Sequence, residues 1–477
     1  MLFPSRISSS ESIGLTEDER MTVKQMVQQW KKHLHGNRRR QEIYDQKNLF
    51  HDLRISTPPQ LRDLGPVLGW GARAVDSVAD RVIFERFATF DSDNDFGLSD
   101  IATDNDFRVE FSQATVSALT QSCSFITVSQ GLDGEPETLW TTRSAEQATG
   151  IWDRRRRGLS AGMTVTPNHT TGEPERIVVY FPYKTVDITI SGGRYYSTVM
   201  QNNTGRLPME VIRFRPDLRR PFGRSRITPT VEYCIMGGVR TMVRSEVGAE
   251  FFAAPQRYGI GLSDKDFQID RWTAVMGRYL TVEKDEDGDL PQLGQFSQHS
   301  MVPHMDHLRM WAAQMSGESS VPMSELGFVS DNPSSDAAIQ SQREPLRMIA
   351  DDMVRVSTGA LRRLAVTTVM IQDDVSEPPE GTEQIQVKFA PTFRPSDSGA
   401  SDAVLKQISA LPWLADSPVI LEKLNYSADD IERLLSDKKR GEAREALNEL
   451  LHRQRQDSER QLPQAESVGG SENDDTG

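Results

Sequence analysis

The sequence predicts an α+β protein in which long helices follow a strand-rich segment. Two stretches carry apolar residues at helical spacing, one from about Ser225 to Ala254 and one from about Ser335 to Ile371. Between Ile101 and Val211 the pattern changes to short β-branched runs separated by Gly, Pro and Asn, which is typical of strands and turns. Strands and helices that are grouped along the chain, rather than alternating, favour the α+β class.

The amino-terminal part begins with residues 1–14, which we expect to be disordered. A polar helix is predicted over 16–46, starting at the capping box Thr16–Glu19. A second helix is predicted over about 71–84, with one apolar face made by Ala74, Val75, Val78, Ala79 and Val82. The clearest strand patterns of the following segment lie at 164–166, 176–181 and 185–190.

The apolar positions of the helix that ends before Pro255 are Val231, Ile235, Val239, Met242, Val243, Val247 and Phe251. Residues 257–299 predict two strands around an acidic turn at 283–289, and a short helix is expected over 303–316. A stretch rich in Gly, Ser and Pro, 317–334, then precedes the helix that continues to Ile371. At 1.5 Å per residue this helix would span roughly 55 Å, and Pro345 should kink it.

The last part of the chain holds a predicted strand at 384–389 and a charged helical region at 401–455. The tail, 456–477, is rich in Gln, Ser, Gly and acids, and we expect it to be disordered.

Composition limits the classes of function. The 477 residues include 55 basic and 69 acidic side chains, for a net charge of -14. This balance argues against tight binding of phosphates, although it does not argue against weak, repulsive contact with DNA. Cys123 and Cys234 have no metal-ligand spacing and are read as reduced thiols of a cytoplasmic chain. The amino terminus lacks a signal-peptide pattern, and no apolar run predicts a membrane span.

Two motifs resemble nucleotide and calcium sites. Gly69–Ala74 fits the dinucleotide fingerprint and precedes a helix, but that fingerprint needs a buried strand before it, and the proline-rich residues 58–66 cannot form one. We interpret it as a helix start packed closely on a neighbour. The segment Asp91–Gly97 opens like an EF-hand loop, but Phe96 and Ala102 stand where such a loop needs Gly and Glu. A solvated acidic turn is the better interpretation.

Two further clusters carry little functional signal. His299, His304 and His307 lie close together, but no cysteine or carboxylate partner completes a metal site. Arg154–Arg157 is the only dense basic run, which can contact nucleic acid, solvent or a neighbouring subunit. The sequence therefore predicts no catalytic residue, no cofactor and no metal, and we expect a protein that is not an enzyme.

Four segments taken together resemble the portal proteins of siphovirus-type tailed bacteriophages, particularly those of actinobacterial hosts. They are residues 68–87, beginning Leu68-Gly-Trp-Gly-Ala-Arg; Arg220-Pro-Phe-Gly-Arg-Ser-Arg-Ile227; Ala253-Ala-Pro-Gln-Arg-Tyr258; and Ser330-Asp-Asn-Pro-Ser-Ser-Asp-Ala-Ala-Ile339. Each is weak alone, but their order over about 300 residues makes the resemblance specific.

The resemblance implies a portal fold, with long stem and channel helices, a β-rich wing, a small α/β clip and a helical crown. On this chain the wing takes 1–219 and receives a return strand from 373–396. The stem takes 220–256 and 300–316, with the clip, 257–299, between them. The tunnel loop takes 317–334 and the long channel helix 335–372. The crown takes 397–455, and the disordered tail 456–477.

Two groups of site residues follow from this resemblance. Phe222, Gly223, Arg224 and Ser225 would form the approach to the first stem helix. The tunnel loop would narrow the channel. It carries Glu318, Glu325 and Asp331 with no Lys or Arg, so that a ring would present DNA with a collar of negative charge. An acidic loop of no functional consequence is the alternative.

The resemblance also implies the partners. The chain would form a ring of twelve subunits at the capsid portal vertex of a virion, after synthesis in the host cytoplasm. Double-stranded DNA would pass through it. The clip would contact the terminase large subunit and later the head-tail adaptor, and the wing would face the major capsid protein and scaffold, with no membrane involved. The alternatives are another virion structural protein, such as a minor head protein, or a nucleotide-dependent enzyme built around Gly69–Ala74.

Overall fold

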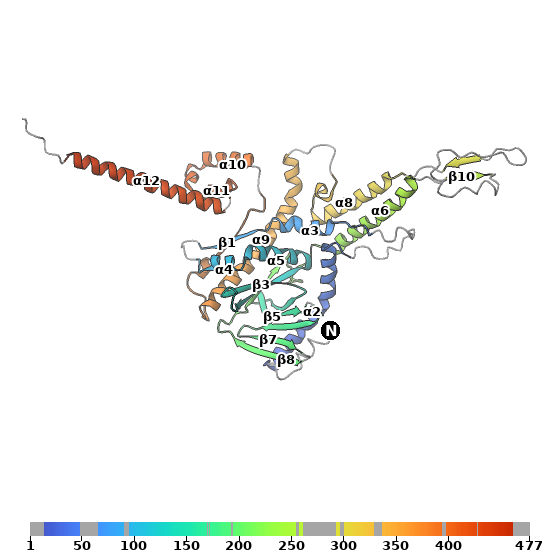
Figure 1. Cartoon of the computed structure of the whole chain (residues 1–477), viewed down its shortest axis with the longest axis horizontal. Coiled ribbons are helices and arrows are strands. Elements are labelled where there is room, and N and C mark those ends of the chain that lie inside the picture. The colour runs from blue at the N-terminus through green and yellow to red at the C-terminus, as the bar shows by residue number, and fades with distance from the viewer. Residues whose placement is uncertain are drawn as a thin grey trace, which may run out of the picture. The chain divides into compact units, whose positions relative to one another are not determined.

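The computed structural model describes residues 14–47, 65–89, 95–168, 170, 172–191, 194–253, 257–260, 292–295, 300–328, 336–393, 397–426 and 428–460. The chain divides into two compact units, Met1–Thr392 and Phe393–Gly477, and Figure 1 shows the elements of both. The described part mixes helices with antiparallel sheets, which confirms the predicted α+β class. None of its helices is apolar over a length that could cross a membrane.

A five-stranded antiparallel sheet forms one half of the first unit. Its strands follow chain order: β4 (Ala148–Asp153), β5 (Gly158–Pro167), β6 (Pro174–Tyr180), β7 (Lys184–Ser191) and β8 (Arg194–Gln201). The three strongest strand predictions fall on β5, β6 and β7. Alternate residues of these strands form one buried apolar face, which includes Met163, Val165, Ile177, Val179, Val186 and Ile188.

Helix α2 (Glu17–Tyr44) packs on that face. Its buried positions Val23, Met26, Val27, Trp30 and Leu34 recur every three or four residues, the period of one helix face. The predicted capping box is present: the Thr16 backbone N–H donates to Glu19 Oε2 (2.7 Å), and the Glu19 N–H donates to Thr16 Oγ1 (3.4 Å). The prediction of a helix over 16–46 is therefore confirmed, apart from its last two residues.

A smaller sheet also lies mostly in the segment predicted to hold strands, but two helices before it show where the sequence interpretation was wrong. The sheet has the order β3 (Thr138–Ser144), β2 (Cys123–Gln130), β9 (Met209–Arg213). Before it lie α4 (Leu98–Asp104) and α5 (Phe107–Gln121), in a region interpreted as strands. The Val and Thr residues of α5 suggested strands, whereas its buried residues keep the helical period: Phe107, Phe111, Ala114, Ala118 and Leu119.

Helix α3 (Trp70–Ala79) ends five residues earlier than predicted, because the chain then enters a strand. This strand, β1 (Phe84–Ala88), pairs antiparallel with β12 (Gln386–Phe389), about 300 residues further along the chain. The 3-10 turn η5 (Thr382–Gln384) leads into β12. The local sequence pattern around Phe84 could not predict this pairing, because the partner strand is so distant along the chain.

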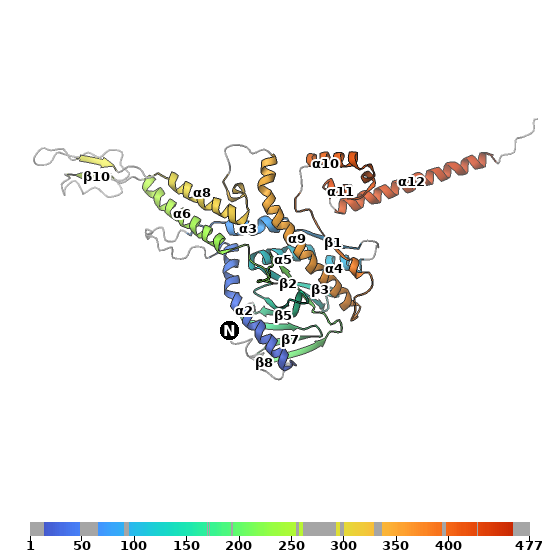
Figure 2. The same cartoon turned by 180° about the vertical axis from the view of Figure 1, so that it is seen from behind.

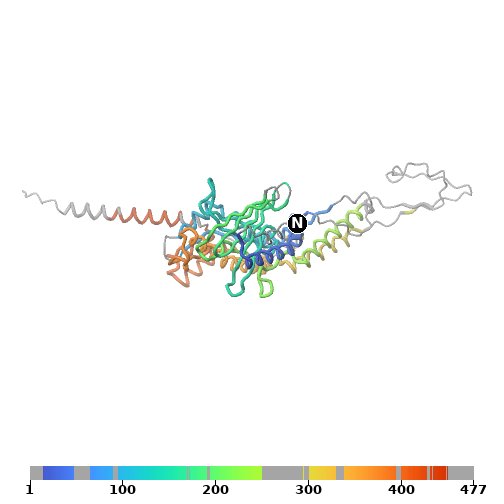
Figure 3. The backbone as a smooth tube through the Cα atoms, turned by 90° about the horizontal axis from the view of Figure 1, so that it is seen from below, coloured from blue at the N-terminus to red at the C-terminus, as the bar shows by residue number. Residues whose placement is uncertain are grey.

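Three helices of the first unit surround the candidate site: α6 (Pro229–Ala253), α8 (Val302–Ser319) and α9 (Asp336–Gln372), with the 3-10 turn η4 (Met323–Leu326) between the last two. Figures 1, 2 and 3 show α6 and α8 running side by side. The α9 helix continues through Pro345 and buries the apolar positions that its sequence predicted: Leu346, Ile349, Ala350, Met353, Leu361, Leu364 and Ala365.

Between α6 and α8 the structure describes the antiparallel pair β10 (Arg257–Ile260) and β11 (Gln292–Gln295) and the two residues that precede α8. The predicted acidic turn at 283–289 lies outside the described residues, as do 1–13 and the tail from residue 461. The second unit contains α10 (Asp397–Ala410), the 3-10 turn η6 (Pro412–Asp416), α11 (Val419–Lys423) and α12 (Ala428–Arg460). Its small core is made by Val404, Leu414 and Ile420.

Candidate functional site

The approach to α6 is a tight turn that only glycine can form. Gly223 has φ of +79°, and a Cβ there would lie 2.2 Å from the carbonyl oxygen of Phe214. The N–H of the next residue, Arg224, donates to that same carbonyl at 2.9 Å. A side chain at position 223 would therefore be strained and would also break this hydrogen bond.

The neighbouring residues of the predicted group have distinct positions. The Phe222 ring lies between those of Phe125 and Trp152, with centroids at 6.3 and 6.4 Å. Ser225 is buried and donates from Oγ to the carbonyl of Thr120 at 2.5 Å, and its Oγ accepts the N–H of Ile227 at 2.9 Å. Only the side chain of Arg224 is exposed. These residues hold the approach to α6 against β2, β4 and α5.

Helix α6 itself begins at Pro229, four residues later than predicted. Thr228 caps it, because its Oγ1 accepts the N–H of Val231 at 3.2 Å, and proline at the first helical position needs no hydrogen-bond acceptor.

Arg226 is the residue of this region that the sequence analysis missed. Its side chain is 7% exposed. Nε donates to the carbonyl of Ala74 in α3 at 2.6 Å, and Nη2 donates to that of Ser319 at the end of α8 at 2.7 Å. Burial lowers the pKa of the guanidinium to about 10, so it stays charged at neutral pH. One side chain thus ties together α3, α8 and the approach to α6. The only sequence signal was its place in the resembling segment.

Two adjacent glycines of α6 allow close packing on different neighbours. A Cβ on Gly237 would lie 2.5 Å from the Trp311 ring of α8, and one on Gly238 would lie 2.5 Å from Leu68, just before α3. Beside this contact, Thr241 Oγ1 and His307 Nδ1 are 3.1 Å apart. The α6 stripe predicted from sequence is buried at Val231, Ile235, Val239 and Val243.

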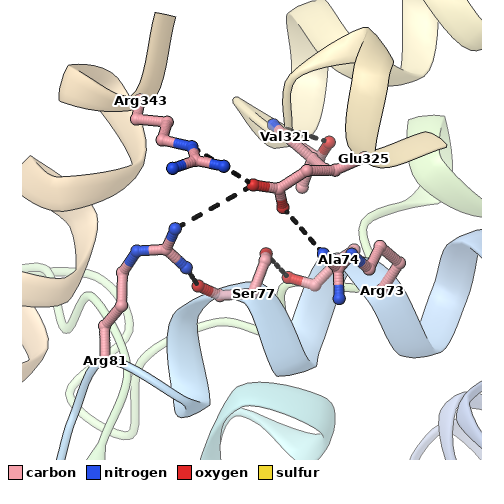
Figure 4. A network of polar contacts seen from close by, with 8 residues as sticks. Arg73, Ala74, Ser77, Arg81, Val321, Glu325 and Arg343 are labelled. Atoms are coloured by element: carbon pink, nitrogen blue, oxygen red, sulfur yellow. Dashed lines mark hydrogen bonds and ion pairs between the residues drawn. The ribbon is translucent and has the colours of Figure 1, made fainter. Parts of the chain in front are cut away.

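Figure 4 shows how the predicted loop residue Glu325 lies among three arginines. Its carboxylate is 3.2 Å from Arg73 Nη2, 3.7 Å from Arg343 Nε and 4.0 Å from Arg81 Nη2. The Glu325 side chain is 11% exposed, so these pairs are screened less than surface pairs. The sequence of the loop contains no basic residue, but the fold supplies them from α3, the turn after it and α9.

Of the other two acidic residues of the predicted loop, the structure describes only Glu318. Glu318 lies within α8, which continues three residues beyond its predicted end, and Glu318 Oε1 accepts a hydrogen bond from Thr228 Oγ1 at 2.8 Å. Asp331 lies outside the described residues. Glu318 and Glu325 are therefore both bonded to other groups of the chain, and their contact with DNA stays a prediction.

The structure also bears on the motifs that resemble nucleotide and metal sites. Residues 65–68, before the Gly69–Ala74 fingerprint, form no strand, and a Cβ on Gly71 would lie 2.8 Å from Ile43 of α2. That glycine therefore permits close packing of two helices. Asp91 and Asp93 lie outside the described residues, as does His299. Across the described part, no group of three or more His, Cys, Asp or Glu side chains is arranged to hold a metal ion.

Two known proteins are similar to this chain in sequence. No model of a known protein family matches the chain. The protein named Portal protein of Mycobacterium phage L5 is 24% identical over 318 residues, which cover 64% of this chain and 64% of the phage protein. The Portal protein of Mycobacterium phage D29 is 24% identical over 307 residues, covering 61% of this chain and 62% of that protein. The predicted resemblance to phage portal proteins is confirmed, although this chain spans less than two thirds of each relative.

The search of solved structures found partial similarity to chains of gene transfer agent (GTA) particles. A chain from the neck of an empty GTA particle, computed with C6 symmetry, has a TM-score of 0.45 and 14% identity, covering 78% of this chain and 95% of that one. A chain from the virion of a native GTA particle has a TM-score of 0.44 and 15% identity, with the same two coverages.

Proposed function

We propose that this chain is a phage portal protein, a ring of twelve subunits that forms the DNA channel at one capsid vertex. The observation that carries the proposal is the sequence similarity to two portal proteins over more than 300 residues. The arrangement around Arg226 supports it. There the approach to the long helix α6 is fixed to α3 and to the end of α8. The portal fold and its division into wing, stem, clip, crown and tail are part of this proposal.

The partners belong to the proposal as well. The ring would nucleate head assembly and dock the terminase, which would hydrolyse ATP. After packaging, it would receive the head-tail adaptor and serve as the exit for DNA. We propose that residues 257–299 contact terminase and adaptor, and that the wing faces the capsid protein and scaffold. The chain would be a virion component without catalytic activity of its own.

We further propose that the segment 317–334 lines the channel. The three arginines around Glu325 offset its charge, so a repulsive collar would depend on Glu318 and Asp331. We expect a chain with Glu318→Lys and Asp331→Lys to form the same ring as the unchanged chain but to fill fewer heads with DNA. Normal filling of heads by this variant would contradict the collar.

Native mass spectrometry of the purified chain tests the proposed function directly. Twelve copies of a 53.6 kDa chain give a closed ring of about 643 kDa, the outcome we expect from one repeated head-to-tail interface. Mixing the chain with scaffold and capsid protein should then yield heads whose number rises with the amount of ring. A stable monomer under both conditions would contradict the proposal and favour a minor head protein.

A further inference from the structure

A basic pocket of about 810 Å³ lies between α2, β4 and the approach to α6. Its cationic side chains come from three separate segments of the chain: Arg40, Arg154, Arg219, Arg220 and Arg224. Among the described residues that line it there is no Asp or Glu. Four of these arginines are exposed, and none of those four makes an ion pair within the described part of the chain. The pocket therefore holds a concentration of unneutralised positive charge on a chain whose net charge is -14.

Four aromatic side chains also line the basic pocket, Trp30, Phe125, Trp152 and Phe222, and we call them its aromatic floor. Polar side chains of α2, including Gln25, Gln29 and Asn37, line the pocket as well. Aromatic side chains at the centre and arginines at the rim are the composition enriched where one protein binds another. Double-stranded DNA, by contrast, is gripped mainly through its phosphates by basic side chains, and an aromatic floor below the rim contributes nothing to that contact.

The complementary surface is on the same chain. The acidic loop, residues 373–383, joins α9 to η5 and carries five carboxylates without one Lys or Arg: Asp373, Asp374, Glu377, Glu380 and Glu383. All five are exposed, and within the described residues none forms a salt bridge. The loop also offers Val375, Pro378 and Pro379 as apolar groups between the charges.

The basic pocket and the acidic loop belong to elements on different sides of the first unit. Figures 1 and 2 show α2, which forms one wall of the basic pocket, on the opposite side of the unit from the end of α9 that leads into the acidic loop. A chain cannot fill its own pocket with this loop. Different complementary patches on opposite sides are what a heterologous, head-to-tail contact requires, and such a contact closes into a ring when its rotation allows.

We infer that the basic pocket binds the acidic loop of a second copy of this chain, and that this contact joins neighbouring subunits. The inference rests on the proposed ring and specifies one of its interfaces. Arginines at the rim would pair with carboxylates of the neighbouring loop, while its prolines and Val375 cover the aromatic floor. Charge complementarity of this kind sets the register of the partners and speeds their encounter.

A charge-reversal experiment on the full chain tests the inference. One variant carries Arg154→Glu, Arg219→Glu and Arg220→Glu, and another carries Asp373→Arg, Glu377→Arg and Glu380→Arg. Asp374 and Glu383 are kept, because they bond to Asn203 and to the N–H of Gly381. The control for the arginine variant reverses three exposed cations of α12 in the second unit, Lys438, Lys439 and Arg440, which changes the net charge of the chain by the same amount without altering the pocket.

Each variant alone would place like charges opposite each other, and we expect its ring fraction in native mass spectra to fall about tenfold or more. Mixing the two variants should restore the ring, because the acidic pocket of one then meets the basic loop of the other. The control should assemble as the unchanged chain does. Full assembly of either variant alone, or failure of the mixture although both variants keep the native circular dichroism spectrum, would overturn the inference.

Cross-linking separates this inference from the proposed function. Copies with Arg220→Cys are mixed with copies with Glu377→Cys and treated with a short bismaleimide, while the native thiols Cys123 and Cys234 stay buried. We expect a cross-linked dimer of chains. If a ring forms but this product does not, the inferred interface is wrong and the proposed ring still stands. A chain that forms no ring but gives the product would overturn the proposed ring alone. Binding of duplex DNA that is lost in the Arg variant, with unchanged assembly, would assign the pocket to DNA instead.

Discussion

At the scale of single residues, Arg226 combines a buried charge with neutral partners. It bonds to carbonyl oxygens of two helices and has no carboxylate within the contacts described for it. A lysine at this position could reach one carbonyl but not hold both in a planar fork. We expect Arg226→Lys to lower the free energy of unfolding by about 1–3 kcal/mol, measured by chemical denaturation, because a buried acceptor loses its donor.

The matched control for this change is Arg224→Lys, two residues away on the exposed side of the same segment. A surface substitution of this kind should change the free energy of unfolding by no more than about 0.5 kcal/mol. Equal effects at both positions would show that Arg226 contributes nothing through its two carbonyl contacts.

The two cysteines allow a second prediction at this scale. Both are buried, and burial raises the pKa of the Cys123 thiol to about 12 and that of Cys234 above its ordinary value. A raised pKa leaves almost no reactive thiolate at pH 8. We expect Ellman's reagent to react with neither thiol of the native chain at that pH, and with both after addition of urea. Rapid reaction of one thiol in the native protein would contradict their burial.

At the scale of elements, the contact between α6 and α8 depends on the absence of a side chain at Gly237. An added methyl group would meet the Trp311 ring at 2.5–2.7 Å, so the two helices would have to separate. We expect Gly237→Ala to lower the free energy of unfolding by about 1–3 kcal/mol in a thermal or chemical denaturation series, the usual cost of overpacking.

Gly359 of α9 is the control, since it lies exposed in a helix interior and a Cβ there would meet only Arg363 Nη1, at 3.7 Å. Gly359→Ala should stabilise the protein by about 0.5–1 kcal/mol, because alanine favours the helix. A stabilising effect at both positions would mean that α6 and α8 are not in close contact.

The same elements show how far the sequence determines the structure. Periodicity and caps are local, so the α2 capping box and the apolar stripes of α6 and α9 were predictable. The pairing of Phe84–Ala88 with Gln386–Phe389 was not, because no local pattern encodes a partner 300 residues away. The cluster around Glu325 was missed for the same reason: its arginines come from other segments. In α5 the signal was present in the spacing of Phe107 and Phe111 but was outweighed by β-branched neighbours.

At the scale of the whole molecule, the last prediction concerns the two units. The large buried clusters lie in the first unit, Met1–Thr392, and the second has a small core of its own. The basic pocket and the acidic loop both belong to the first unit. Subunit contacts made through them therefore require nothing from the second.

We accordingly expect a chain that ends at Thr392 to keep the thermal unfolding midpoint of the first unit and to form a ring with the same number of subunits. Native mass spectrometry gives that number as the particle mass divided by the mass of the shortened chain. The shortened chain with Asp373→Arg, Glu377→Arg and Glu380→Arg serves as the control that should remain unassembled. If the unchanged shortened chain stays monomeric while folded, the second unit must supply a subunit contact, and the pocket and loop alone do not close the ring.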